Sequence, residues 1–419
     1  MAEVRLVLNP LYVGTSYHPS ENRQANRSGF MAELNGCWGM MASTKWNEFR
    51  ICEFNREWVG ESRRVWDDLI AQSNANPVFM SWAWVASWLE TIGRHKEIKV
   101  LGLCEGDRLI AVLPLLIDRR SSALWGRHVS LAGGWHADPD YSDLLCAIGY
   151  ESVAIEMFAS WIISWNEWTQ CEFQDVLPEA LVRRMAQLME PAGVVEDTAG
   201  SGCTRLLLVK GWEHILKERF DRKRRYNIER QMRLAVEKQH LRMVFHEAPE
   251  DVERAFPILL RLHDERKAMQ GIKSQFSCEG RGEFHSLAAV RLSEARRAFI
   301  VFFETNEEVV AAAYCLRDVT RLYYFQTGVS AYGIAQGAGS TLLYLLIRWA
   351  SDQGLSWFEF LKGDEEYKKS WMTEIVEQRT LRISRKSSHG RLAFAMGKAR
   401  RNVGTALRAW QASLPLKQS

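Results

Sequence analysis

The chain has 419 residues, of which 47% are hydrophobic and 25% are charged. This is ordinary globular composition, so wholesale disorder, a collagen-like repeat and a coiled-coil rod are excluded. One hydrophobic core rarely serves more than about 250–300 residues, and the length therefore predicts two domains. The formal net charge is +3, but it is unevenly distributed, because residues 380–419 hold nine Lys or Arg and no Asp or Glu.

Membrane insertion and export have no support in the sequence. The longest apolar runs, 152–165 and 337–350, are shorter than the ~20 residues that a membrane-spanning helix needs. The N-terminus lacks the apolar stretch and small-residue cleavage site of a secretory signal. The eight cysteines are scattered and form no C-x-x-C pair, which predicts reduced thiols and no metal site. We therefore expect a cytoplasmic protein.

The first half of the chain shows a regular order of elements. Residues 1–45 are rich in Gly, Ser and Asn without periodicity, which predicts a disordered or loosely attached leader. The apolar spacing from Phe79 to Ile92 predicts an amphipathic helix that Ser81 caps. Two apolar strands then flank Gly106 as a hairpin. The remaining predictions are a strand near 129–132, a helix over 151–165, a strand near 168–176 and a helix over 179–190.

The second half repeats this order. Its predicted elements are helices over 249–270 and 284–294, a hairpin within 298–318, a strand over 321–329, a helix over 337–352 and a strand over 356–361. The repetition predicts a duplicated α/β or α+β unit, in which a mixed, mostly antiparallel sheet is flanked by helices. We expect an N-terminal domain over 46–205, a C-terminal domain over 206–385 and a basic tail over 386–419.

Two segments are strongly basic. Residues 217–242 hold ten Lys or Arg against four Asp or Glu, and Ile228, Met232 and Ala235 form an apolar stripe within them. A helix with one buried face accounts for this pattern, and so does a groove-lining helix that holds a phosphate or another anion. In the tail, the spacing from Gly390 to Trp410 predicts a docked helix, with attraction to anionic lipid or nucleic acid as the alternative.

A glycine-rich turn at Gln336-Gly337-Ala338-Gly339-Ser340 carries the most chemical information. It lies between a predicted strand and a predicted helix. Glycines let backbone N–H groups approach a ligand closely, and a helix N-terminus attracts an anion, so a pyrophosphate would fit. A flexible turn before a tight helix start is the alternative. The turn is neither a Walker loop nor a dinucleotide-binding fingerprint, because the residues that these motifs require are missing.

The order of hairpin, strand, glycine-rich turn, helix and strand resembles the GNAT acyltransferase superfamily, whose turn binds the pyrophosphate of acyl-coenzyme A. Gly337 and Gly339 match the glycines of that turn. The family's Arg or Gln position is Ile334 here, with Gln336 two places later. The resemblance implies that an acyl-CoA donor binds in the second half, and the first half lacks an equivalent turn.

A narrower resemblance covers roughly residues 50–385. The pieces that match are FMSWAWVASWL at 79–89, the hairpin at Gly106, DYSDLL at 140–145, RFDRKRRYNIERQ at 219–231 and SWFEFLKGDEEYKKSW at 356–371. They are similar to the CelD-type, or BioF2-like, acetyltransferases associated with bacterial cellulose and exopolysaccharide clusters. This implies tandem GNAT folds related to the FemAB-type aminoacyltransferases.

Acyl transfer needs a base for the acceptor and a proton for the leaving thiolate. The end of the strand at 356–361 and the sharp turn after it are where open sheets place ligands. We predict Glu359 or Asp364 as the base and Tyr367 as the proton donor. Lys362 and Lys368 are predicted anion contacts. Asp364 capping the next helix, and Tyr367 packing its inner face, are the structural alternatives.

The first half offers a polar loop for the acceptor. His136, Asp140 and Asp143 are predicted to bind substrate, although a cation site or a simple turn fits the same residues. His285 resembles a family position on a helix and is a further substrate-binding candidate, with a satisfied buried histidine as the alternative.

Three functions are consistent with these residues. The first is transfer of an acetyl or longer acyl group from acyl-CoA to an amine or hydroxyl of a sugar or small metabolite. The second is a FemAB-like transfer from aminoacyl-tRNA, which the basic segment at 222–233 favours. The third is a non-catalytic role in exopolysaccharide assembly through the basic tail, at a membrane or on an anionic partner.

Overall fold

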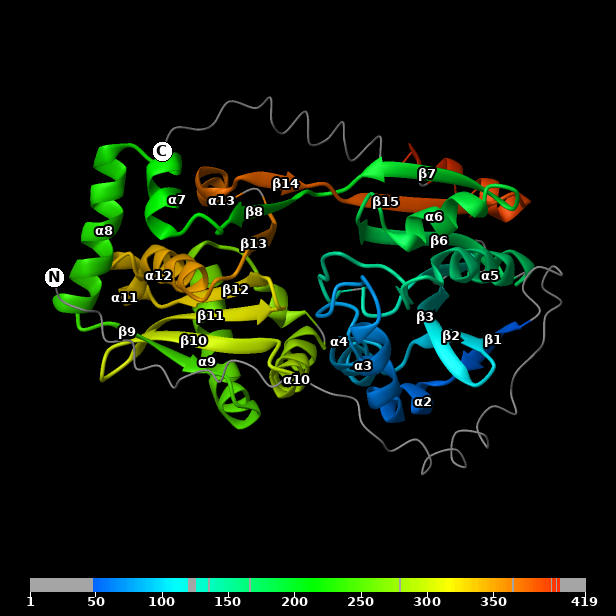
Figure 1. The fold of residues 1–419 in the computed structure, drawn as a ribbon, viewed down its shortest axis with the longest axis horizontal. Coiled ribbons are helices and arrows are strands. Elements are labelled where there is room, and N and C mark those ends of the chain that lie inside the picture. The colour runs from blue at the N-terminus through cyan, green and yellow to red at the C-terminus, as the bar shows by residue number, and fades with distance from the viewer. Residues whose placement is uncertain are drawn as a thin grey trace. The chain divides into compact units, whose positions relative to one another are not determined.

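The computed structural model describes residues 48–119, 126–134, 136–165, 167–278, 280–363, 365–392, 394–396 and 398–399. They form an α/β protein whose two mixed sheets are flanked by helices (Figure 1). The leader expected over 1–45 and the tail from residue 400 onward lie outside the described residues. The tail, for which the sequence predicts a helix from Gly390, is helical from residue 388 in its described part.

The first sheet has eight strands among the described residues, in the order β1-β2-β3-β4-β6-β15-β7, with β5 paired to β3. Its strands are β1 (Phe49–Phe54), β2 (Glu97–Glu105), β3 (Arg108–Arg119), β4 (Arg127–Leu131), β5 (Leu145–Cys146), β6 (Trp168–Val176), β7 (Gly193–Ala199) and β15 (Arg379–Arg385). The helices of this half are α2 (Arg56–Glu61), α3 (Arg63–Ala71), α4 (Trp82–Glu90), α5 (Glu151–Ser164) and α6 (Leu181–Leu188).

The second sheet has seven strands in the described chain, in the order β14-β8-β13-β12-β11-β10-β9. These are β8 (Cys203–Leu207), β9 (Arg242–His246), β10 (Ala298–Glu304), β11 (Val309–Arg317), β12 (Arg321–Val329), β13 (Trp357–Lys362) and β14 (Glu374–Val376). Its helices are α7 (Trp212–Arg219), α8 (Arg222–Glu237), α9 (Pro249–Met269), the short η3 (Gln275–Ser277), α10 (Arg281–Glu294), α11 (Ala331–Ala335), α12 (Ala338–Asp352) and α13 (Glu366–Trp371).

The two sheets have the same construction. Each contains a hairpin, β2–β3 or β10–β11, followed by an antiparallel third strand. That third strand then pairs in parallel with a later one, as β4 with β6 and as β12 with β13. The repeated order of elements that the sequence predicts is therefore present in the fold.

The halves also exchange strands. β8 follows β7 in the chain but pairs with β13 and β14 in the second sheet. In return, β15 follows β14 but inserts between β6 and β7 in the first sheet (Figure 1). The sequence division assigns residues 379–385 to the C-terminal domain, whereas they complete the N-terminal sheet. The reason is that strand pairing depends on free backbone edges in space, which the local sequence does not encode.

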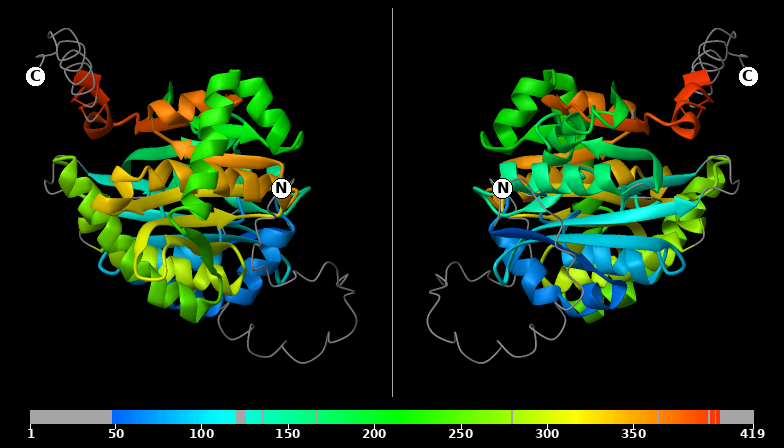
Figure 2. Two further views of the ribbon diagram at one scale, coloured as in Figure 1. Left: turned by 90° about the vertical axis from the view of Figure 1, so that its left-hand side faces the viewer. Right: turned by 90° about the vertical axis from the view of Figure 1, so that its right-hand side faces the viewer.

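Local signals place most elements where the sequence predicts them. The Ser81 side chain accepts a hydrogen bond from the Trp84 N–H and so caps α4. The apolar stripe of the basic segment becomes the buried face of α8. In Figures 1 and 2, α8 runs along the outside of the second half next to α12.

Each sheet has its own hydrophobic core, and helices from the two halves pack against each other. α4 of the first half packs against α10 of the second. There the rings of Trp84 and Phe284 lie edge to face, with 4.9 Å between their centroids. At the rim of this contact Arg291 pairs with Glu90 at 2.9 Å. Large apolar contact between halves makes independent motion unfavourable.

Candidate functional site

The parallel strands β12 and β13 separate towards their C-terminal ends. They pair from Arg321 and Trp357 as far as Tyr323 and Glu359. β12 then continues to Val329 and β13 to Lys362 without further mutual pairing. Open sheets place their ligands at the carboxyl ends of such strands, so this opening is the candidate site.

Irregular backbone on both strands accompanies the opening. The register between β11 and β12 shifts beside Tyr314, which leaves Phe325 as an extra residue on β12. On β13, Leu361 adopts a positive φ of 63°, and the register with β8 shifts between Glu359 and Leu361. Bulges re-aim side chains and end strand pairing, which is what both strands do here.

Two adjoining cavities fill the opening. The larger measures about 490 Å³ and the smaller about 320 Å³. Four residues line both of them: Arg266, Tyr324, Thr327 and Tyr367. The cavities are therefore two ends of one site, with the smaller at the glycine-rich turn and the larger towards the first half.

The glycine-rich turn and the basic helix meet at the smaller cavity. Gly337 has a φ of +68° and starts α12, whose first backbone N–H groups have no partner within the helix. Gln231 of α8 donates hydrogen bonds to the Gly337 carbonyl at 3.1 Å and to the Ser340 and Thr341 hydroxyls. Arg224 of α8 lines the same cavity. The helix terminus and this guanidinium together make the smaller cavity suitable for an anion.

The five residues of the predicted turn have different surroundings. Gly337, Gly339 and Ser340 line the smaller cavity. Ala338 is buried at the start of α12. Gln336 is exposed, and its side chain accepts a hydrogen bond from Gln239 at 2.7 Å, outside the cavity lining.

Lys362 and Lys368 line the larger cavity, but both ammonium groups already have partners. Lys362 Nζ lies 3.0 Å from Asp175 and 3.5 Å from Asp140. Burial alone would lower the Lys362 pKa, but these two carboxylates outweigh it and raise the pKa. Lys368 pairs with Glu365 at 3.0 Å. Both lysines therefore form ion pairs within the protein beside the cavity, so neither ammonium group is an unpaired charge for a ligand.

Tyr367 is the predicted proton donor, and it lines both cavities. Its ring lies edge-on to Phe360, with 6.2 Å between centroids. Burial raises the pKa of the Tyr367 hydroxyl. The phenol is therefore protonated at neutral pH and able to donate. Asp364, the alternative base in the turn before α13, lies outside the described residues.

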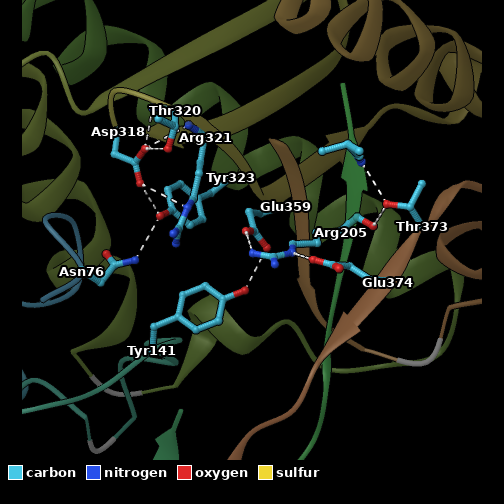
Figure 3. Close-up of polar contacts among 11 residues, drawn as sticks. Asn76, Tyr141, Arg205, Asp318, Thr320, Arg321, Tyr323, Glu359, Thr373 and Glu374 are labelled. Carbon is cyan, nitrogen blue, oxygen red and sulfur yellow. Dashed lines mark hydrogen bonds and ion pairs between the residues drawn. The ribbon is translucent and has the colours of Figure 1, made fainter. Parts of the chain in front are cut away.

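Glu359, the first predicted base, is fully buried at 0% exposure. Tyr141 of the first half donates a 2.8 Å hydrogen bond to its Oε2, and Arg205 lies 3.8 Å from its Oε1 (Figure 3). Burial raises the Glu359 pKa, while Tyr141 and Arg205 oppose that shift. The side chain lines neither of the two cavities. Its geometry is that of a link between the halves at the root of the opening.

A second link lies beside the first. Tyr323 donates to Asp318 at 2.7 Å and accepts from Asn76 of the first half at 3.0 Å (Figure 3). Arg321 belongs to the same group and lies 3.9 Å from Asp318. These polar contacts fix how the loops of the first half meet β12 and β13.

The predicted acceptor residues of the first half have different surroundings. His136 lines a third cavity of about 380 Å³, which shares Asp138 with the larger cavity. Asp140 lines the larger cavity, is 2% exposed and accepts from Gln378 at 3.2 Å. Burial raises the Asp140 pKa.

The other two candidates have structural contacts, and Asp143 also lines a separate cavity of about 550 Å³. Asp143 accepts backbone N–H groups of Leu181 and Val182 at 2.9 and 2.8 Å and so caps α6. His285 is 1% exposed and packs among aromatic rings, including Trp84 and Phe325. Neither residue lines the larger or smaller cavity.

Sequence reasoning missed the contribution of α9. His263, Arg266, Lys267 and Gln270 line the larger cavity from this helix. They recur at spacings of three and four, so they share one helical face. That spacing is visible in the sequence, but a polar stripe on a surface helix has the same pattern, and only the packing of α9 on β12 distinguishes the two.

Two further observations concern metals and membranes. The described residues contain no cluster of His, Cys, Asp and Glu that could hold a metal ion. Within the same part of the chain, every helix is too short or too polar to cross a bilayer.

Residues 222–369 match the family model described as acetyltransferase (GNAT) domain. The match runs from α8 to α13 and so contains the glycine-rich turn and both diverging strands. No curated protein matches the chain. Residues 222–369 therefore form a GNAT acetyltransferase domain. The domain belongs to the CelD-type, BioF2-like family, as the sequence resemblance implied.

Solved structures show that the likeness in fold extends beyond this domain. FemX is similar at a TM-score of 0.52 and 10% identity, over 79% of this chain and 96% of that chain. The C-terminal domain of a putative lysylphosphatidylglycerol synthetase from Agrobacterium fabrum is similar at 0.50 and 10%, over 80% and 96%. A tandem GNAT protein from the clavulanic acid biosynthesis pathway aligns at 0.42 and 12%, over 81% and 99%. The first two likenesses extend over most of this chain and concern the fold alone.

Proposed function

We propose that the protein transfers an acyl group from acyl-CoA to an amine or hydroxyl of a sugar or another small metabolite. The observation that carries this proposal is the site formed where β12 and β13 separate. It has a helix N-terminus and cationic side chains at one end and polar residues from both halves at the other. The match of residues 222–369 to a GNAT domain supports the same donor.

The smaller cavity would hold the phosphates of the donor. Its wall combines the first turn of α12 with Arg224 and Arg266, which are suited to charge-assisted hydrogen bonds with phosphate oxygens. Gly337 fits this use, because a Cβ there would lie 2.8 Å from Gln231 Nε2 and fill the cradle. The pantetheine amides could then pair with the edge of β12 that β13 leaves free, in the manner of an added strand.

The thioester would then lie between the cavities, close to Tyr367. A protonated phenol there can give its proton to the leaving thiolate. The acceptor would enter from the larger cavity, which connects through Asp138 to the third cavity of the first half. His136 and Asp140 are at this end of the site, so we retain them as candidate acceptor contacts.

The acceptor, the pathway and the location of the protein are proposed from separate features. The proposal that the acceptor is a saccharide of an exopolysaccharide or cellulose pathway rests on the family resemblance. Contact of the basic tail with a membrane or an anionic partner rests on its charge alone. A cytoplasmic location is supported by the seven described cysteines, all of which are free thiols.

Replacing Gly337 by Asp tests the donor site. The new carboxylate would stand against the pyrophosphate, and we expect acetyl-CoA affinity to fall by about 100-fold, equivalent to roughly 2.7 kcal/mol. Isothermal titration with CoA, acetyl-CoA and a long-chain acyl-CoA measures this and reports the acyl preference of the wild-type protein.

Gly354→Asp is the matched control. Gly354 also has a positive φ, +75°, at the other end of α12, with no atom near the position of its Cβ. It reproduces the backbone strain and the added charge away from the turn, so its donor affinity should stay at the wild-type value. Unchanged affinity in Gly337→Asp would contradict the proposed donor site.

A second candidate function is transfer from aminoacyl-tRNA. It is favoured by the outer face of α8, where Arg222, Lys223, Arg230 and Arg233 have no ion pair with any described residue. The similarity to FemX is consistent with it in fold. Binding of tRNA that weakens steeply with salt, together with no binding of acyl-CoA, would replace the first function by this one.

A further inference from the structure

A buried histidine on α9 lines the larger cavity. His263 is 1% exposed. Its Nε2 has no hydrogen-bond partner among the described residues. Leaving a buried polar atom unpaired costs free energy, which a hydrogen bond to a ligand would recover. Nε2 is itself covered, so contact with a ligand in the adjoining cavity requires a small rotation of the imidazole.

The other ring nitrogen is held in place. Nδ1 of His263 lies 3.1 Å from Ser274 Oγ and 3.8 Å from Asp264 Oδ1. The Ser274 hydroxyl is itself fixed, because it accepts the Phe276 N–H at 3.2 Å. A carboxylate beside Nδ1 favours the proton on that nitrogen, which leaves the lone pair on Nε2. The imidazole is thus oriented as a hydrogen-bond and proton acceptor.

The packing of α9 brings this group to the diverging strands. A Cβ on Gly328 of β12 would lie 2.5 Å from the His263 backbone N and 2.6 Å from Leu262 Cβ, so glycine permits the close approach. Thr327 and Tyr367 line the same cavity as His263. The histidine therefore belongs to the part of the site where the thioester and the acceptor would meet.

The charge state of His263 permits proton uptake, because only a neutral imidazole can accept a proton. Burial, followed by the nearby Lys267, lowers its pKa to about 4, and Asp264 opposes the shift. The imidazole is consequently neutral at physiological pH. Glu359, in contrast, is covered by Tyr141 and lies outside both cavities.

We propose that His263 is the general base of the acyl transfer, an inference that rests on the function proposed above. Its Nε2 takes the proton of the attacking N–H or O–H as the acceptor atom bonds to the thioester carbon. The carbon–sulfur bond then breaks, and the thiolate leaves with a proton from Tyr367 or from the imidazolium. If Tyr367 gives the proton, the imidazolium returns its own to the phenolate. The products are the acylated acceptor and free CoA thiol, and both side chains regain their starting states.

His263→Gln tests the assignment. Thiol release from acetyl-CoA is measured with hydroxylamine in place of the natural acceptor. We expect kcat to fall by about 100-fold or more, the usual contribution of a general base, while the KM for acetyl-CoA changes by less than about threefold. Added imidazole should restore part of the activity of His263→Ala, which a purely structural role would not allow.

His285→Gln is the matched control, because His285 is equally buried but lines neither cavity. Its kcat should stay near the wild-type value. If His263→Gln does not fold, Asp264→Asn replaces it, since the Asp264 side chain is 52% exposed and its loss should lower kcat by about three- to tenfold without unfolding the protein.

Several outcomes would overturn the assignment. Wild-type kcat in His263→Gln would do so, and so would equal losses in the two histidine variants without rescue by imidazole. A wild-type protein that binds acetyl-CoA but releases no thiol to hydroxylamine also contradicts it, because a base beside the thioester should activate any small nucleophile. In each of these cases the Gly337→Asp titration still stands, so failure of the base is distinguishable from failure of the donor site.

Discussion

In both halves two parallel strands separate towards their C-terminal ends, but different residues surround the opening. In the second half, β12 and β13 separate beyond Tyr323, and a glycine-rich turn and α12 follow β12. In the first half, β4 and β6 pair only as far as Val129 and Cys171, and a third cavity of about 380 Å³ lies beyond. After β4, however, the described chain continues as loop and the short β5 before any helix.

The side chains at the first opening are paired with one another. His128 lies 3.2 Å from Glu172, and Arg382 of the exchanged strand β15 lies 2.8 Å from the same carboxylate. Lys362 crosses from the second half to Asp175. Strand topology thus creates an opening in both halves. The residues at its rim decide whether the opening can accept an anionic donor or is held by internal ion pairs.

Truncation before β15 should damage the first half most severely. Without residues 377–419, β6 and β7 lose the strand between them, and the first core loses Leu381 and Ile383. We expect the cooperative unfolding transition to disappear, because the loss exceeds the about 5–15 kcal/mol by which a typical protein is stable. Near-ultraviolet circular dichroism during heating measures this.

A chain that ends at residue 399 keeps every described strand and serves as the control for the truncation. It should retain a cooperative transition. A native-like transition in the shorter chain would mean that the strand exchange is dispensable.

Glu172→Gln should weaken the first half without affecting donor binding. Burial would raise the Glu172 pKa, but the His128 hydrogen bond and Arg382 outweigh it and lower the pKa to about 2. Because the folded-state pKa is below the ordinary value, the carboxylate stabilises the fold above about pH 4.5 and loses this effect as pH falls towards 2. We expect the substitution to cost about 2 kcal/mol at pH 7 and little near pH 2.

Urea unfolding of both proteins at several pH values checks this, with acetyl-CoA titration beside it. Glu61→Gln, at an exposed position, is the control and should change the free energy of unfolding by less than about 0.5 kcal/mol. A loss that is the same at every pH, or a fall in donor affinity, would argue against the separation of roles between the two openings.

Glu359→Gln should have the smallest effect. The Gln oxygen can still accept from Tyr141, while the attraction to Arg205 is lost, so we expect a loss of about 1 kcal/mol in stability. Turnover should remain within about threefold of wild type, because the side chain lies outside both cavities. Steady-state kinetics on the folded variant measures this, and a fall of 100-fold or more would return Glu359 to the role of base.

Local features of the fold could be predicted from the sequence because they depend on neighbouring residues. The predicted strand at 168–176 has the same bounds in the structure, and so does the strand at 321–329. Hydrophobic period and capping act over a few residues, which is why Ser81 and the stripe of α8 were also predicted correctly. The resemblance to the GNAT superfamily identified the glycine-rich turn in the same way.

The candidate site was only partly predictable. Gly337 and Tyr367 line it as expected, but the pairing of Lys362 with Asp175 joins residues almost two hundred positions apart. Such contacts depend on which surfaces the fold brings together, and no local pattern reports them. The same holds for His263, whose role depends on where α9 packs.

Short-range periodicity and backbone preference specify most of the elements, their repeated order and the kind of turn that starts α12. The tertiary structure alone decided that β8 and β15 change places, that α8 closes over the Gly337 turn, and that Glu359 is sealed beneath Tyr141. Those outcomes follow from edge pairing, burial and charge in three dimensions, where residues distant in the chain become neighbours.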